Sequence, residues 1–140
     1  MRQFIERLEQ ITHDVNTAES KRAKVMGFMQ DCPAVCFIKD ATTGQYQYVN
    51  TAYRQVITVD PIGRTDVELF DLKLAKIFVE HDLNVLSKGE PFVVLESLPI
   101  IDRDKPVCFL MLKFLIVNGD RSIGGLGIEV PESLQDQFAK

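Results

Sequence analysis

The sequence lacks the features that several functional classes require. Its 16 lysines and arginines are outnumbered by 20 acidic residues, so the net charge is −4 and no basic surface for nucleic acid is indicated. Three cysteines are too few for a disulfide framework and indicate free thiols in a reducing compartment. The longest apolar run, residues 107–116, is too short to span a bilayer and contains Lys113. No signal-peptide core follows Met1, so we expect a cytoplasmic chain without membrane insertion.

The composition is that of an ordinary globular domain. The chain has 140 residues, of which 46% are apolar and 26% charged. This length allows one domain with a substantial buried core and excludes an intrinsically disordered chain.

The first thirty residues differ from the rest because they contain one glycine and no proline. Their apolar residues alternate in steps of four and three, a spacing typical of a coiled coil, with Arg22 as the exception. The pattern predicts an amphipathic, dimerising helix over residues 1–30. Its apolar seam would consist of Phe4, Leu8, Ile11, Val15, Ala18, Val25 and Met29.

Two alternatives to a continuous dimer seam remain open. The segment 16–19 also resembles a helix cap followed by its reciprocal glutamate, so the helix can break and restart there. The helix can also fold back on its own domain and cover strand residues Cys36, Ile38, Tyr46 and Tyr48.

Residues 31–130 show a change from helical to strand periodicity and back. Pro33 ends the first helix, Asn50 caps a short helix, and a capping box at 65–68 opens another. Strands are predicted at 35–39, 45–49, 92–98, 107–116 and 123–130, and helices at 50–56, 65–70 and 71–88. The fold class is therefore α+β, with a five-stranded antiparallel sheet and helices on one face. Residues 131–140 are predicted to be a polar tail or the start of a linker.

Several motifs in this order resemble the PAS sensory domain of bacterial sensor kinases and transcriptional regulators. They are residues 37–40, 48–53, 63–70, 82–91 and the glycine-bearing strand 123–128. The signature positions that carry the resemblance are Asp40, Gly44, Asn50, Gly63, Thr65 and Gly89.

The resemblance implies a pocket between the sheet and the helices. The residues expected to line it are Phe37, Gln47, Val49, Tyr53, Phe78, His81 and Val85. Gln47 and His81 are its polar members, and a small pocket with a few convergent polar groups is typical of a ligand site. The alternative is that these residues only fill the core.

No cofactor or metal is expected. His81 lies where haem-binding PAS domains carry their proximal histidine, but strand 92–98 lacks the distal arginine or histidine that those sensors use. Segment 65–70 lacks the cysteine of flavin-binding PAS domains, and the three cysteines lack zinc-site spacing. Cys36 and Cys108 are expected to be buried structural thiols.

The sequence therefore predicts a sensory PAS module with no catalytic residues of its own. It would bind a small ligand or a partner and relay the signal through a homodimer to an output domain, such as the histidine kinase of a two-component system or a transcriptional regulator. One alternative is a ligand-free PAS domain that acts only in dimerisation. The other is a small α+β enzyme with His81 and Asp82 as acid and base, although adjacent helix positions point about a third of a turn apart.

Overall fold

A computed structural model describes residues 1–13 and 18–138 of the chain, with side chains except at residues 8–13, 18–22, 118 and 138. A five-stranded sheet in the order β2-β1-β5-β4-β3 forms its centre. The strands are β1 (Val35–Asp40), β2 (Tyr46–Val49), β3 (Phe92–Leu98), β4 (Val107–Asn118) and β5 (Asp120–Glu129). All neighbouring pairs are antiparallel, which confirms the predicted sheet.

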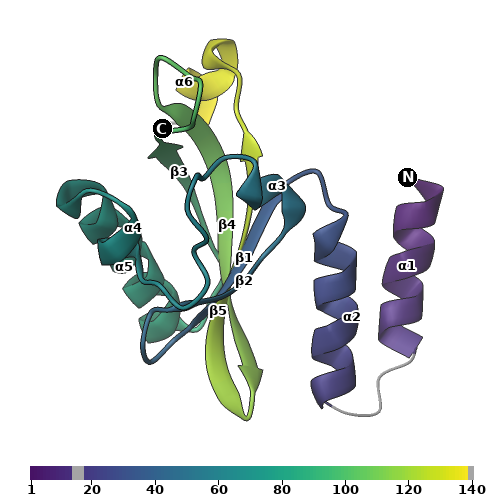
Figure 1. Ribbon diagram of the computed structural model, residues 1–140. Helices are drawn as coiled ribbons and strands as arrows, with labels where there is room; N and C mark the ends of the chain where they lie inside the picture. The colour runs from purple at the N-terminus through teal and green to yellow at the C-terminus, as the bar shows by residue number, and fades with distance from the viewer. Residues whose placement is uncertain (14–17, 139–140) are drawn as a thin grey trace.

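Short and long helices cover one face of this sheet. They are α3 (Thr51–Arg54), α4 (Asp66–Leu69) and α5 (Leu72–Lys88), while α1 (Arg2–His13) and α2 (Ala18–Gln30) lie on the other side of the sheet from α4 and α5 (Figure 1). None of the helices among the described residues is both long and apolar enough to cross a membrane.

The predicted caps and turns set the helix boundaries. The side chain of Asn50 accepts the backbone N–H of Tyr53, and Asp71 accepts that of Leu74 in the same way. The backbone N–H of Thr65 donates to Glu68 Oε1 at 3.1 Å, as a capping box requires. Helix α5 ends at Gly89, whose φ of 67° is the left-handed conformation that glycine adopts without strain. Gly44 and Gly63 also have positive φ, and Asp40 accepts the N–H groups of Thr42 and Thr43 in its turn.

A bulge in β2 changes which residues of this strand face the core. Phe37 pairs with Val49 and Ile38 with Tyr48, but Lys39 pairs with Tyr46, so Gln47 is the extra residue. Tyr46 consequently faces the core and Gln47 is exposed. The predictions of Gln47 in the pocket and Tyr46 on the outer face were therefore wrong, because simple alternation does not hold across a bulge.

Glycines in β5 make room for large side chains of the core. A Cβ at Gly125 would lie 2.1 Å from the ring of Phe37, and one at Gly127 would lie 2.6 Å from Met111. The close approach that these glycines permit explains their place inside a strand.

The N-terminal segment is a helical hairpin and not one helix over residues 1–30. Phe4 of α1 contacts Phe28 at 4.9 Å between ring centroids, and Arg7 pairs with Asp31 at 3.3 Å. Pairing two short helices buries apolar surface within one chain, so a single extended seam is not required. The alternative of a break near residues 16–19 falls partly on residues 14–17, which lie outside the described part of the chain.

The predicted seam is divided by this hairpin. Phe4 packs against its own chain, Val25 is half-buried and Met29 is 4% exposed. Val15 lies outside the described residues, as do the side chains of Leu8, Ile11 and Ala18.

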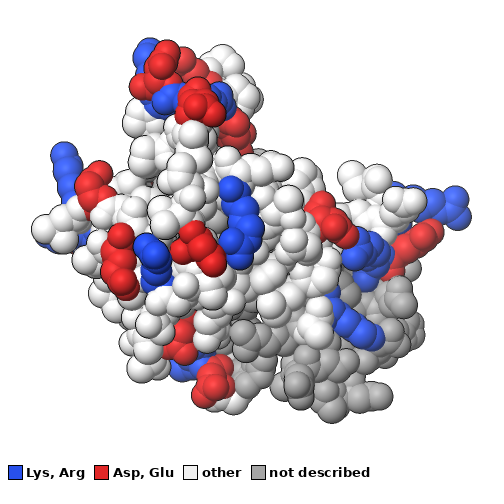
Figure 2. All heavy atoms as spheres, in the orientation of Figure 1, with Lys and Arg blue, Asp and Glu red and all other residues white. Residues whose placement is uncertain are grey.

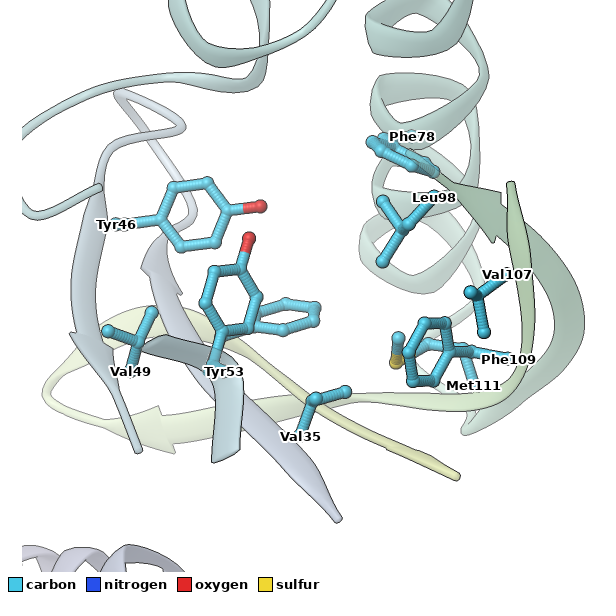
Figure 3. Close-up of a cluster of buried hydrophobic side chains, with 10 residues drawn as sticks. Val35, Tyr46, Val49, Tyr53, Phe78, Leu98, Val107, Phe109 and Met111 are labelled. Atoms are coloured by element: carbon cyan, nitrogen blue, oxygen red, sulfur yellow. The ribbon is translucent and has the colours of Figure 1, made fainter. Parts of the chain in front are cut away.

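The hydrophobic core lies between the sheet and the helices on its covered face (Figure 3). Tyr46 and Val49 from β2, Tyr53 from α3 and Phe78 from α5 meet residues of β3 and β4 there. Beyond the sheet, the predicted polar tail instead forms η1 (Glu132–Leu134) and α6 (Gln135–Phe138).

Candidate functional site

Six ionisable side chains meet in the interior of the domain, and we call them the interior cluster. They are Lys39 from β1, Asp66 from α4, His81 and Asp82 from α5, Glu96 from β3 and Lys113 from β4. Both lysines are 1% exposed, and Asp66, Asp82 and Glu96 are 3%, 8% and 5% exposed. Charged residues are rarely buried to this degree unless they are paired, so their geometry is informative.

Lys39 joins the sheet to two helices. Its Nζ lies 2.6 Å from Asp66 Oδ2 and 2.8 Å from Asp82 Oδ2. The hydroxyl of Tyr46 donates to the other oxygen of Asp66 at 2.6 Å. Asp66 is the first residue of α4, so these contacts fix that short helix to strands β1 and β2.

Lys113 joins the same carboxylate system to strand β3. Its Nζ lies 2.7 Å from Glu96 Oε2 and 3.3 Å from Asp82 Oδ1. His81 completes the cluster at its edge, with Nδ1 2.6 Å from Glu96 Oε2 and a side chain that is 19% exposed. The six residues thus form one continuous network from α4 to β3.

Aromatic rings surround the two ammonium groups. Lys39 Nζ lies 5.0 Å from the ring centroids of both Phe37 and Tyr46, and Lys113 Nζ lies 5.4 Å from that of Phe78. These distances allow cation–π attraction. The hydroxyls of Tyr46 and Tyr53 point toward each other (Figure 3).

Two opposing effects set the pKa values in the cluster: burial disfavours the charged forms, and pairing with opposite charges favours them. Burial opposes the charge of Lys39, but Asp82 and Asp66 outweigh it and raise the pKa of its ammonium group. Burial likewise opposes the charge of Glu96, yet His81 and Lys113 lower the pKa of this carboxyl below its ordinary 4.5. Burial raises the pKa of Tyr53 to about 12 and that of Tyr46 well above 10. At neutral pH Lys39 and Glu96 are therefore charged and the two phenols neutral.

The space at the centre of the cluster is small. A cavity of about 10 Å³ is lined by Lys39, Glu96, Lys113 and the surrounding aromatic and apolar side chains. This is the room that one water molecule needs. Among the described residues, no buried side-chain nitrogen or oxygen lacks a hydrogen-bond partner.

The structure gathers most of the predicted pocket residues around this centre. Phe37, Tyr53 and Phe78 line the small cavity, and His81 belongs to the cluster. Val49 and Val85 are buried in the core but do not line the cavity. Gln47 is exposed on β2, where its side-chain amide approaches Asp40 at 3.4 Å.

Four cluster residues were missed by the sequence analysis: Lys39, Asp66, Glu96 and Lys113. A signal for two of them exists in strands β3 and β4. Lys113 lies in phase with the inward residues Phe109 and Met111, and Glu96 lies in phase with Leu98. A charged residue at an inward strand position indicates a buried partner.

His81 and Asp82 belong to one network although they are adjacent on α5. Lys113 connects them, because it contacts both Asp82 and the Glu96 carboxylate that His81 binds. The link is indirect, and neither residue lines the small cavity. Asp82 pairs with both lysines, so it is not a free base.

Other candidate chemistry is weaker. The three cysteines are free, and Cys36 and Cys108 are buried as predicted; burial raises the pKa of Cys36 to about 12. No metal-binding group of histidine, cysteine and acidic residues occurs in the described part of the chain. Figure 2 shows basic and acidic side chains interspersed on the visible face, with no extended patch of one sign.

Comparisons with known proteins find similarity of structure only. No protein-family model and no curated protein sequence matches this chain. Among solved structures, a phage VqmA–DPO complex superposes with a TM-score of 0.69 at 17% identity, over 85% of this chain and 57% of that one. The chain thus spans little more than half the length of that VqmA.

Two isolated PAS domains match over most of their own length. The PAS domain of Bordetella pertussis BvgS gives a TM-score of 0.65 at 19% identity, over 84% of this chain and 91% of that one. The PAS domain of the Cronobacter turicensis quorum-sensing receptor RpfR, in complex with C12:0, gives 0.56 at 17% identity, over 72% and 97%. Together with the β2-β1-β5-β4-β3 sheet and its covering helices, these likenesses show that the chain has the PAS fold.

Proposed function

We propose that this chain is a sensory domain that binds a small polar molecule at the interior cluster. The observation that carries the proposal is the burial of five charged side chains and two tyrosines between the sheet and the helices, with His81 at their edge. A core built only for stability does better with apolar residues of similar volume, because buried ion pairs rarely repay their desolvation cost. A polar interior is what a polar ligand requires.

The charges also argue against an acyl chain as the ligand. A hydrocarbon lying against Lys39, Glu96 and Lys113 would make no polar contact with these charged groups and would keep water away from them. The RpfR PAS domain in complex with C12:0 shares the fold, but the interior of this chain favours a compact ligand with hydrogen-bonding groups. Flat rings would suit the walls formed by Phe37, Tyr46 and Phe78.

Helix α4 is the element that such a ligand would displace. The four-residue helix is fixed to the sheet through Asp66, which pairs with Lys39 and accepts the hydroxyl of Tyr46. A ligand that takes over either contact favours an arrangement in which α4 is released. Binding would then shift the population between a closed and an open interior.

Asn50 connects the interior to the N-terminal helices. Its Oδ1 accepts the N–H groups of Cys36 and Tyr53, and its Nδ2 donates to Met29 O at the end of α2. The hydroxyl of Tyr48 also donates to Met26 O. We propose that a shift of Tyr53 at the cluster reaches α2 through these contacts.

The relay would end in a homodimer and an output partner. Phe4 is 46% exposed and Ile5 47% exposed on α1, which leaves apolar surface for a second copy even though the helices form a hairpin. The output partner would be a histidine kinase or a regulatory domain in the cytoplasm, and the domain itself would be non-enzymatic.

A second candidate is a PAS domain that binds no ligand and serves only in dimerisation. The 10 Å³ cavity and the complete pairing of the cluster favour this alternative. The ligand-free candidate differs from the ligand-binding one in a single respect, namely that its interior never opens.

A titration followed by ¹H–¹⁵N NMR separates these candidates. The probes are nucleobases, pyridine carboxylates and free amino acids on one side, and dodecanoate on the other. We expect at least one polar compound to shift the amide signals of Lys39, Tyr53 and Lys113, and to lose this effect in Lys113→Met. Shifts caused by dodecanoate at these residues contradict the polar-ligand proposal, and no shift from any probe favours the filled core.

Haem is not part of the proposal, because the residues do not fit it. The cavity beside the cluster has the volume of about one water molecule, far below that of a porphyrin. We expect the purified protein to be colourless. A Soret absorption band that disappears in His81→Ala would contradict this expectation.

A further inference from the structure

The charges of the interior cluster do not balance without one additional proton. The cluster contains two ammonium groups, from Lys39 and Lys113, and three carboxylates, from Asp66, Asp82 and Glu96. All five are almost completely buried. An uncompensated charge in such a place is costly, so the sixth member, His81, decides whether the cluster is neutral.

His81 is positioned to hold this proton and to exchange it with solvent. Its Nδ1 lies 2.6 Å from Glu96 Oε2, and its side chain keeps 19% exposure while that of Glu96 keeps 3%. The same Glu96 oxygen contacts Lys113, which pairs with Asp82. Asp82 in turn pairs with Lys39, and Lys39 pairs with Asp66. The ring of His81 lies 5.4 Å from Phe92 on β3.

The charge of His81 matters more than the hydrogen bond itself. A neutral imidazole with its hydrogen on Nδ1 still donates to the Glu96 carboxylate, but deprotonation removes the Coulomb attraction between an imidazolium and a carboxylate. When the proton leaves, the cluster holds three buried anions against two cations. Histidine is the side chain that changes charge between pH 5 and 8 without any perturbation.

The affected contact connects α5 to the edge of the sheet. Strand β3 is the outermost strand on its side, and His81 to Glu96 is the polar contact described between α5 and this strand. Asp82 holds the same helix to β1 and β4. Weakening the His81–Glu96 contact would therefore free α5 from β3, while the Asp82 contacts would still hold α5 to β1 and β4.

We propose that the His81–Glu96 pair is a proton-binding site that controls closure of the interior, with the protonated pair closed and the deprotonated pair open. This inference rests on the proposed ligand site, because the opening it describes would regulate access to that site. Protons would thus act at the α5–β3 contact and the small polar ligand at α4, and both would change access to the same interior.

Hydrogen exchange measured by mass spectrometry at pH 6.0 and pH 8.0 tests the proposal without any ligand. The rates are corrected for the intrinsic pH dependence of exchange, and peptides from residues 72–88 and 92–98 are compared. We expect the protection of both segments to fall about tenfold at pH 8.0, because the loss of one ion pair at the edge of the interior weakens the closed state. Protection in β5 should not change.

Two variants test the roles of His81 and Glu96, and a third serves as a control. His81→Gln cannot become charged, so its protection at pH 6.0 should already equal that of the parent protein at pH 8.0. Glu96→Gln balances the two lysines against two carboxylates, so its protection should be independent of pH. His13→Gln removes the other histidine of the chain and should behave like the parent protein.

Equal protection of the parent protein at both pH values overturns the proposal, and so does a pH response that persists in Glu96→Gln. If His81→Gln fails to fold, Glu96→Gln still decides the question. Ligand binding in the NMR titration is a separate measurement, so a pH-insensitive protein that binds a polar probe would refute the proton site alone.

Discussion

Asn50 illustrates how much one buried polar side chain can hold together. It is 0% exposed and forms hydrogen bonds with strand β1, with the first turn of α3 and with the end of α2. The sequence identified it as an N-cap, which is correct. Its bonds to Met29 O and Ala34 O were outside the reach of sequence analysis, because they depend on how α2 meets the sheet.

Asn50→Ala should therefore cost more than the loss of a cap. A cap alone contributes about 1 kcal/mol, whereas each buried partner left unsatisfied costs about 1–3 kcal/mol. We expect the free energy of unfolding, measured with urea, to fall by about 3 kcal/mol in total. The exposed Gln45→Ala provides the control, and a loss of 1 kcal/mol or less at Asn50 would show that these contacts are not formed in solution.

Lys113 is a second residue whose replacement should lower the stability of the fold. Lys113→Met keeps the length of the side chain but leaves Glu96 and Asp82 without a cation that contacts both. Breaking a buried ion pair in this way costs about 3–5 kcal/mol. Urea unfolding should show this loss, while Lys76→Met on the exposed side of α5 should change little; equal stability of the two variants would refute the pairing.

At the scale of elements, α5 and β3 are joined through Glu96, and this contact predicts that the stability of the fold decreases at acid pH. Because the pKa of Glu96 is lower in the folded protein than its ordinary 4.5, the stability it provides is present above that pH and is lost as the pH falls. Urea midpoints between pH 6 and pH 3 should decline more steeply for the parent protein than for Glu96→Gln. The half-buried Asp40 and the exposed Asp60, whose pKa values are also lowered by hydrogen bonds, contribute equally to both proteins.

The packing of β2 and α3 around the cluster predicts the behaviour of the tyrosines in alkali. Burial raises the pKa of Tyr46 and Tyr53 above 10, so stability from the neutral phenols is lost only as the pH rises beyond that value. Absorbance at the phenolate band should show both groups un-ionised at pH 10. Ionisation of all three tyrosines near pH 10, without unfolding, would show that the interior is open.

Most elements were predictable because their signals are local. Caps at Asn50 and Thr65, the glycine after α5 and the alternation in β3 and β4 depend on a few neighbouring residues. The bulge at Gln47 has no such signal, since it results from pairing with β1. Lys39 and Asp82 are 43 positions apart, so the fold alone brings them together.

For the whole molecule, the N-terminal hairpin limits how the chain can pair with a second copy. Periodicity predicted a seam along residues 4–29, but the structure divides it between two helices. We expect light scattering to give the mass of a homodimer for the full chain, and a lower mass after deletion of residues 1–15. A tight dimer that survives the deletion would place the interface on the sheet.

The central claim is that the interior cluster binds a small polar molecule. Mass spectrometry under non-denaturing conditions tests it most directly, with protein purified from the cells whose genome encodes it. We predict a protein peak that carries one additional small polar molecule, which denaturation releases and which is absent from Lys113→Met purified in parallel. A bare mass of 15.9 kDa per protomer for both proteins under native conditions would contradict the claim.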